Sequence, residues 1–213
     1  MMTVKHVLNE QLAMGYAAGV LPEAFDLVVA AHLSLSDESR ALVSSYEAVG
    51  ACLMEDCTGV DMKHNALSST LDRIKNSANV VQKSRAKNVL PEPIQKYVGG
   101  DVDKVKWKSL GSGVKQAILP TDKKAQARLL YIPAGQSVPD HGHRGLELTL
   151  VLQGSFADEV DHFGRGDIEI ANDDLDHQPV AGLEADCICL TATDAPLRFN
   201  GLVPRILQPL LKI

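Results

Sequence analysis

The feature that most constrains the fold of this chain is the stretch from Gly135 to Gly154, GQSVPDHGHRGLELTLVLQG. It places His141 and His143 two positions apart, and Glu147 follows four positions later. Because side chains alternate between the two faces of a β-strand, we expect these three to point the same way. Buried imidazoles and a buried carboxylate need polar partners, and one divalent cation satisfies them together. The stretch therefore predicts a metal site within a β-sheet.

A second stretch, GDIEIANDDLDH at residues 166–177, predicts a strand, a turn and then a histidine. Together the two stretches resemble the two-part signature of the cupin family. The first part is matched in full, whereas in the second Asn172 and Asp174 stand where the family has Pro and Gly. The resemblance implies a jelly-roll β-barrel with four ligands for one metal ion: His141, His143, Glu147 and His177. The alternative is that these histidines are scattered over the surface.

Three imidazoles and a carboxylate suit Zn²⁺, Fe²⁺, Mn²⁺, Ni²⁺ or Cu²⁺. A closed tetrahedral set favours zinc in a structural or sensing role. An octahedral set leaves positions open for dioxygen or a substrate and favours iron or manganese. We expect one divalent metal in the barrel, with zinc as the first choice and iron, manganese or nickel as alternatives.

The chain divides into a helical part and a β-rich part. Residues 1–80 predict a small helical bundle, and residues 81–93, which are polar and contain two prolines, predict a linker. Residues 94–213 predict the barrel, because short β-rich segments alternate there with Gly, Pro and Asp. The fold class expected is therefore α+β, with an N-terminal helical domain followed by a C-terminal cupin jelly-roll.

Individual elements can be expected as well. The helices are expected at Val7–Val20, at Ala24–Leu35, from the N-cap Ser36 to Leu53, and at Ala66–Ile74. The strands are expected at Val105–Trp107, Val114–Leu119, Ala127–Ile132, Leu146–Leu152, Ile168–Ile170, Asp186–Thr193 and Leu197–Phe199.

Charge and composition exclude several classes of protein. A net charge of −6, without a basic patch that contains aromatics, argues against nucleic-acid binding. No apolar run approaches the roughly 20 residues of a membrane span, no secretory signal opens the chain, and its cysteines do not form a disulfide framework, so the cytoplasm is the expected location. Residues 1–80 carry five Lys or Arg against ten Asp or Glu, a net charge of −5, which favours a partner with a basic surface.

The two-part arrangement resembles the ChrR-type anti-sigma factors of bacteria over nearly the whole chain. The resemblance is carried by NEQLAMGYAAGVLPEAFDLVVAAHLSLSDESRA and by VPDHGHRGLELTLVLQG. In that family the helical domain sequesters an extracytoplasmic-function sigma factor, and the cupin domain receives an oxidative signal that releases it. The resemblance implies an inhibitor and sensor in transcription regulation and the stress response, rather than an enzyme.

The helical part departs from the zinc-dependent anti-sigma pattern. That family carries His-x-x-x-Cys-x-x-Cys and a further histidine near the N-terminus, whereas here His32 is followed by Ser36 and Ser39, with His6 upstream. A neutral hydroxyl is a far weaker zinc ligand than a thiolate. We therefore expect no tight zinc at this degenerate site and expect Ser36 to act as a helix cap.

Cys187 and Cys189 fall on one face of a predicted strand. They are either small buried hydrophobes or redox or signal-linked residues that face the metal.

Two other classes of function stay open. One is a metal-dependent cupin enzyme of the dioxygenase type with a helical appendage, which would need open metal positions and a general acid or base in a pocket. The other is a module that binds a protein other than a sigma factor.

Overall fold

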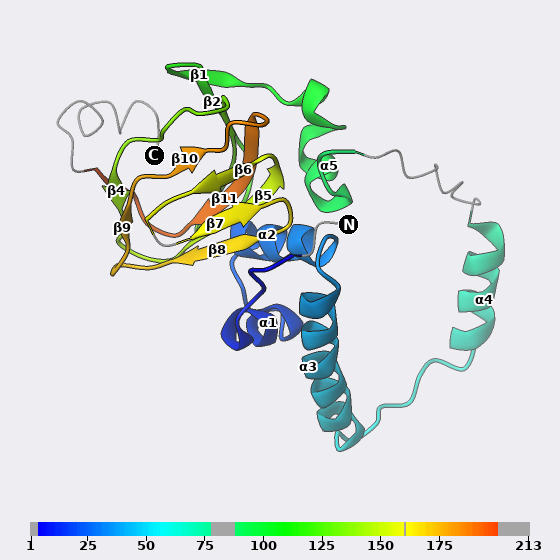
Figure 1. Ribbon diagram of the computed structural model, residues 1–213. Helices are drawn as coiled ribbons and strands as arrows, with labels where there is room; N and C mark the ends of the chain where they lie inside the picture. The colour runs from blue at the N-terminus through cyan, green and yellow to red at the C-terminus, as the bar shows by residue number, and fades with distance from the viewer. Residues whose placement is uncertain (1–3, 78–87, 160, 200–213) are drawn as a thin grey trace.

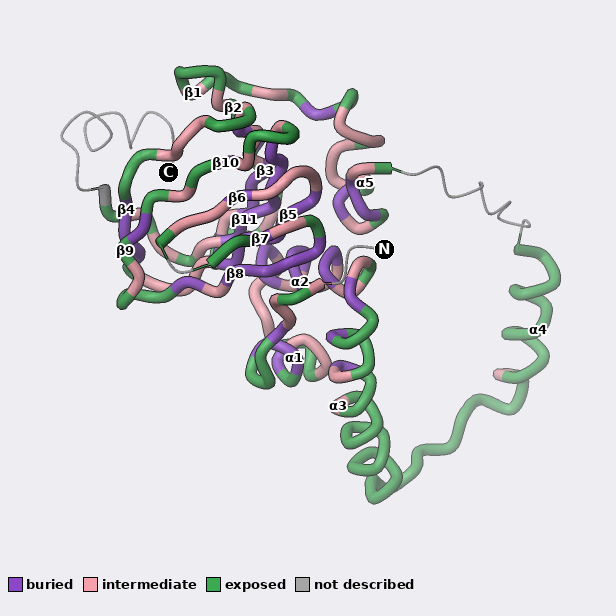
Figure 2. The backbone as a smooth tube through the Cα atoms, viewed as in Figure 1, coloured by how far each residue is buried: buried purple, intermediate pink, exposed green. Residues whose placement is uncertain are grey.

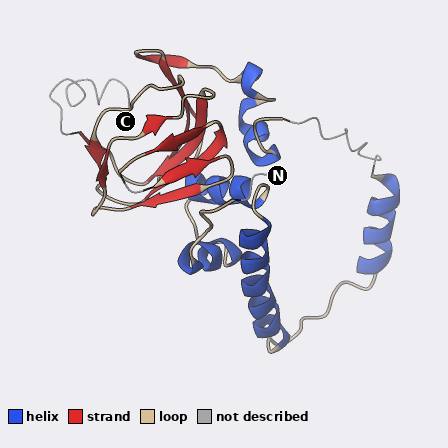
Figure 3. Ribbon diagram, viewed as in Figure 1, coloured by secondary structure: helices blue, strands red, loops and turns tan. Residues whose placement is uncertain are grey.

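A computed structural model describes residues 4–77, 88–159 and 161–199 of the chain. Helices come first along the chain and strands follow (Figures 1 and 3). The helices are α1 (Glu10–Ala17), α2 (Glu23–Leu33), α3 (Asp37–Glu55), α4 (Ala66–Asn76) and α5 (Glu92–Val98), with a 3-10 turn at Val102–Lys104. None of the helices within these residues is long and apolar enough to span a membrane.

Side-chain caps fix where two of the helices begin. Asn9 precedes α1 and accepts a hydrogen bond from the backbone N–H of Leu12 at 2.9 Å. Ser36 caps α3 as predicted, because its hydroxyl accepts the backbone N–H of Ser39 at 3.2 Å. Asp37 then stands in the first turn of α3, where the helix dipole favours negative charge.

The structure differs from the predictions between the two parts of the chain. Helix α5 lies partly in the predicted linker, with Pro91 at its N-cap and Pro93 within its first turn, where a missing N–H costs nothing. Val105–Trp107 forms no strand, and the first strand begins at Lys108 instead. Residues 81–87 of the predicted linker and residues 200–213 of the predicted barrel lie outside the described residues. The domain boundaries stay predictions.

Within the described residues, the strands form three antiparallel sheets. A six-stranded sheet has the order β1-β2-β3-β11-β5-β8, and two three-stranded sheets have the orders β10-β6-β7 and β12-β4-β9. The strands are β1 (Lys108–Gly111), β2 (Val114–Ile118), β3 (Gln126–Ile132), β4 (His141–Gly142), β5 (Glu147–Gln153), β6 (Ser155–Ala157), β7 (His162–Gly164), β8 (Ile168–Ala171), β9 (Asp176–His177), β10 (Val180–Ala181), β11 (Cys187–Thr193) and β12 (Arg198–Phe199).

The outer face of the six-stranded sheet packs against the helices. Alternation along β3, β5 and β11 places Leu129, Leu150 and Leu190 on this face, and all three are fully buried. They share one core with Phe25 and Val28 of α2, which lies beside the sheet in Figure 1. The helical part and the barrel therefore have a common hydrophobic core.

The inner face of the same sheet encloses a second core. Val151, Cys187 and Cys189 pack there with Phe156 of β6 and Phe163 of β7, whose rings stack with centroids 4.9 Å apart. Gly154 turns the chain between β5 and β6 with a φ of 67°, and a Cβ at this position would lie 2.6 Å from the backbone oxygen of Asp186. Glycine is required at that turn.

The C-terminal half of α3 and all of α4 except the partly buried Ala66 are exposed (Figure 2). Helix α4 has no buried residue and lies away from the rest of the described chain in Figure 1. It nevertheless carries Leu67, Leu71 and Ile74 at helical spacing, which places them on one face. These three side chains are 71%, 45% and 63% exposed, so the apolar face of α4 has no partner among the described residues.

Candidate metal centre

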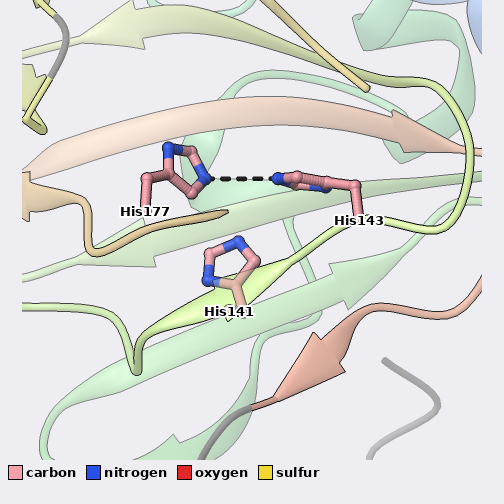
Figure 4. Close-up of side chains that lie close together, drawn as sticks. All are labelled: His141, His143 and His177. Atoms are coloured by element: carbon pink, nitrogen blue, oxygen red, sulfur yellow. Dashed lines mark hydrogen bonds between the residues drawn. The ribbon is translucent and has the colours of Figure 1, made fainter. Parts of the chain in front are cut away.

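Three histidines from two segments of the chain converge inside the barrel (Figure 4). His141 on β4 and His177 on β9 are directly paired across antiparallel strands, and His143 follows β4. All three side chains are buried. One ring nitrogen from each lies within 4.8 Å of the others, which is close enough for all three to share one ion.

Hydrogen bonds orient two of these rings. The Nδ1 of His141 lies 2.8 Å from the carbonyl oxygen of Pro139, and the Nδ1 of His177 lies 2.7 Å from a carboxylate oxygen of Asp158. In each ring the Nδ1–H can donate to oxygen, which leaves a lone pair on Nε2 for a metal. The same arrangement of a histidine held by an oxygen acceptor is usual among metal ligands.

His143 gives the sharpest indication that an ion belongs in the cluster. Its Nε2 lies 3.3 Å from the Nε2 of His177, as the dashed line in Figure 4 marks. Its Nδ1 is buried and has no hydrogen-bond partner among the described residues. Buried polar atoms without partners are rare in folded proteins, and a cation is one group that satisfies them.

Glu147 lies near His143, but it is not part of the group formed by His141, His143 and His177, whose ring nitrogens fall within 4.8 Å of one another. Its carboxylate oxygen is 3.8 Å from the Nδ1 of His143, and its other oxygen accepts the hydroxyl of Thr149 at 3.2 Å. His141 and Glu147 belong to different strands, because the chain bends at residues 144–145. A bend between strands, and not alternation along one strand, therefore places Glu147 near His143.

The cluster is strongly perturbed electrostatically. Burial, reinforced by the nearby His141 and His177, lowers the pKa of His143 to about 4, and burial lowers the pKa of His141 as well. Burial also raises the pKa of Glu147 to about 7, although Arg128 opposes this change. A bound dication would lower the pKa of both histidines further and would oppose the rise in the pKa of Glu147, because it favours neutral imidazoles and an ionised carboxylate.

His177 behaves differently from the other two histidines. Burial lowers its pKa, but hydrogen bonds to Glu169 and Asp158 outweigh burial and raise the pKa to about 9. Its Nδ1 lies 3.3 Å from Glu169 on β8 and 2.7 Å from Asp158 after β6. Asp158 could not be found from the sequence, since it is 19 positions away and belongs to no motif.

The departure from the cupin pattern at Asn172 and Asp174 is accommodated by the turn itself. The side-chain oxygen of Asn172 accepts the backbone N–H of Asp174 at 3.0 Å, and its carbonyl accepts that of Leu175 at 3.1 Å. An Asn side chain can build such a turn without Pro or Gly. The turn leads directly into β9 and His177.

The residues of the degenerate zinc motif divide into two groups. His32, Ser36 and Ser39 are buried together, and the hydroxyl of Ser39 lies 2.7 Å from the Nε2 of His32. The Nδ1–H of His32 donates to the carbonyl of Gly166 at 2.9 Å, and Ser39 accepts the backbone N–H of Leu8 at 3.2 Å. Both nitrogens of His32 are thus occupied by hydrogen bonds that join α2, α3 and the barrel.

His6 lies at a different contact with the barrel. Its Nε2 is 3.0 Å from Asp161, and its carbonyl accepts the backbone N–H of Ile168 at 3.2 Å. The carboxylate of Asp167 accepts the backbone N–H groups of Lys5 and His6 at 2.6 and 3.0 Å. The N-terminal segment is therefore tied to the start of β8, one residue before Glu169.

Gly166 is required at this junction. Its φ is 93°, and a Cβ there would lie 2.7 Å from the side chain of Val4. A larger residue would strain the backbone and separate the N-terminal segment from the barrel.

His32 predicts a pH dependence of stability. Burial lowers its pKa from 6.5 to about 4, so the unfolded chain binds a proton more readily than the folded one. Stability is then lost as the pH falls below 6.5, and the His32 contribution between pH 7 and pH 5 is about 2 kcal/mol. Denaturant unfolding of a His32→Gln variant should therefore show a shallower loss of stability over this range than the parent. A control at the exposed His162, His162→Gln, should leave the slope unchanged, and equal slopes for all three proteins would contradict the assignment.

Cys187 and Cys189 face the interior of the barrel, with their sulfur atoms 3.4 Å apart. Hydrogen bonding to Cys187, together with burial, raises the pKa of Cys189 well above its usual value. Cys189 is therefore a neutral thiol at physiological pH, and neutral thiols react slowly with oxidants.

Helices packed on a barrel that contains a histidine cluster define the class of two-part cupin proteins. A family model described as the ChrR cupin-like domain matches residues 95–196. The chain is 53% identical to the anti-sigma-E factor ChrR of Cereibacter sphaeroides, over 213 residues that cover 100% of both proteins. The chain therefore belongs to the ChrR family of anti-sigma factors.

A solved structure supports the same assignment. The crystal structure of Rhodobacter sphaeroides SigE in complex with the anti-sigma factor ChrR matches with 52% identity and a TM-score of 0.78. The match covers 90% of this chain and 100% of that one. The predicted combination of an N-terminal helical part with a cupin-like barrel is thereby confirmed, and the histidine cluster is compatible with a bound metal.

Proposed function

We propose that this chain is a cytoplasmic anti-sigma factor that sequesters an extracytoplasmic-function sigma factor. The observation that carries the proposal is the identity of 53% over the whole chain with an anti-sigma-E factor, which includes the helical part as well as the barrel. A bacterial sigma factor must present a basic surface to promoter DNA, and the acidic helical part complements such a surface.

The exposed apolar residues of α3 and α4 supply the proposed contact. Leu53 and Met54 near the end of α3 are 66% and 71% exposed, so α3 presents exposed apolar side chains as α4 does. Exposed apolar patches of this kind mark interaction sites in soluble proteins. The helix-in-groove mode of recognition uses the same spacing that Leu67, Leu71 and Ile74 provide.

We further propose one divalent metal in the barrel, with zinc as the expected ion. His141, His143 and His177 would hold it together with Glu147, and Asp158 and Glu169 would orient His177. When bound, zinc would offset the negative charge of the buried carboxylates, and its four protein ligands would leave no open coordination position. No zinc is proposed at His32, because its Nε2 is already bonded to Ser39 and its Nδ1 to Gly166.

The oxidative signal is proposed to enter at the barrel and to pass along β8. Glu169 contacts His177, while Ile168 and Asp167 beside it bind the N-terminal segment. A rearrangement of the metal centre would thus reach the helices through three consecutive residues at the start of β8. Cys187 and Cys189 are proposed as a signal-linked pair because they are adjacent on the inner face of the barrel, and since Cys189 is a neutral thiol that reacts slowly with oxidants, the metal centre is the proposed first point of response.

In vitro transcription tests this proposal. RNA polymerase with the sigma factor encoded beside the chain should lose activity when one equivalent of the full chain is added. The same polymerase with a housekeeping sigma factor is the control and should stay active. Full activity of both polymerases in the presence of the folded protein would contradict the proposed anti-sigma function.

A further inference from the structure

A cavity of about 480 Å³ opens on the inner face of the six-stranded sheet, next to the histidine cluster. Its volume falls within the range of roughly 300–1,000 Å³ that is usual for small-molecule sites. Its wall includes His141 and His177 at the metal centre, and Leu130, Ile132 and Phe156 elsewhere. A metal that only braced the fold would need no such space beside it.

The register of the sheet shows that this wall changes from polar to apolar along the strands. At one end Arg128 of β3 pairs with Thr191 of β11, and Thr191 pairs with Thr149 of β5. The next inward-facing row consists of Leu130, Cys189 and Val151, and the row after it pairs Ile132 with Cys187. The cavity therefore has one polar end and one apolar end.

The metal centre lies at the polar end. Glu169 pairs with Thr149 in the row that contains Arg128 and Thr191, and Glu147 pairs with Thr193 in the next inward-facing row. Arg128 is buried, and its guanidinium donates a hydrogen bond to the side-chain oxygen of Gln126 at 2.5 Å. A ligand at this end meets a buried cation and the imidazoles, which suit an oxygen-bearing head group.

The apolar end favours a chain or ring of carbon atoms. Phe156 and Val138 complete this end of the wall, and Phe156 is buried. Apolar cavities do not hold water well, because water there finds too few hydrogen-bond partners. Hydrocarbon would recover the dispersion contacts that an empty cavity loses.

We propose that the cavity is a binding site for a small aliphatic molecule with a single oxygen-bearing head group, the chemistry of a medium-chain carboxylic acid. The chain of the ligand lies along Leu130 and Ile132, and its head lies between Arg128 and the histidine cluster. The inference deepens the proposed function, on which it rests for its biological meaning: such a ligand would be a signal that the barrel receives. Binding itself requires neither a sigma factor nor transcription.

Titration calorimetry of the full chain with butanoate, hexanoate and octanoate tests the proposal. Each added methylene should tighten binding about fourfold, so that octanoate binds roughly 200-fold more tightly than butanoate. This dependence should hold for both the zinc-loaded and the metal-free protein, because the apolar wall does not involve the metal. Methyl resonances of Leu130 and Ile132 should shift on addition of octanoate.

A cavity-filling variant and a matched control locate the site. Val138→Phe adds bulk at the half-buried wall and should weaken octanoate binding at least tenfold while leaving the metal content unchanged. Val180→Phe makes the same change at a nearby residue that does not line the cavity and should bind as the parent does. Equal affinity for all three acids, or equal binding by the two variants, would overturn the proposal. Absence of octanoate binding would do so too, whereas a failure to inhibit transcription would overturn the anti-sigma function instead.

Discussion

One equivalent of Zn²⁺ added to the metal-free protein is expected to raise its melting temperature by about 10 °C. The reason is that the folded chain brings three imidazole nitrogens within 4.8 Å of one another, whereas the unfolded chain does not. A ligand present at about 1,000 times its dissociation constant stabilises the folded state by roughly 4 kcal/mol. Differential scanning calorimetry, with elemental analysis of the metal content, measures both the shift and the stoichiometry.

A variant at the centre of the cluster makes this expectation specific. His143→Gln retains the approximate size of the side chain but removes an imidazole, and it should reduce both the bound zinc and the thermal shift to near zero. His162→Gln replaces an exposed histidine on β7 and serves as the matched control, with the full shift expected. An unchanged shift in His143→Gln would mean that zinc binds elsewhere in the molecule.

A single charge on α4 is expected to weaken sigma-factor binding by about 30-fold or more, because a central apolar contact is worth about 2 kcal/mol or more. The change is Leu71→Asp, which places a carboxylate between Leu67 and Ile74 on the apolar face. Helix α4 has no buried residue, so the melting temperature should not change. Surface plasmon resonance with the immobilised sigma factor measures the affinity.

The matched control uses the same helix and the same charge. Ser69→Asp lies on the other side of α4 and should bind within a few-fold of the parent, because a charge at the edge of an interface affects affinity little. Equal losses in the two variants would point to the charge of the helix as the cause. If both variants bound the sigma factor as tightly as the parent does, α4 would not be part of the proposed interface.

The sequence was most informative where the signal is local. Of the four predicted ligands, the structure brings His141, His143 and His177 within reach of one ion, and the length of β11 was close to that expected. Ser36 was identified as a cap because capping depends only on the residues that follow it.

What the sequence could not predict depends on contacts between distant segments or on very short elements. β4 and β9, which carry His141 and His177, are two residues long, so no periodicity could reveal them. Asp158 reaches His177 across the barrel, and the pairing of His32 with Gly166 spans 134 positions. Glu147 does not alternate with His141 along one strand as predicted, because the chain bends between β4 and β5.

The six-stranded sheet separates the histidine cluster, which lies on its inner face, from α2, which packs on its outer face. Neighbouring residues in a strand, such as Cys189 and Leu190, point to opposite faces of the sheet and pack in different cores. A change in the curvature of the sheet would therefore move residues on both of its faces at once, without a hinge or a diffusible signal molecule. Substitutions that reshape the interior of the barrel for a new ligand will also change the packing of α2 on the outer face of the sheet. The residues on the two faces must therefore be engineered together.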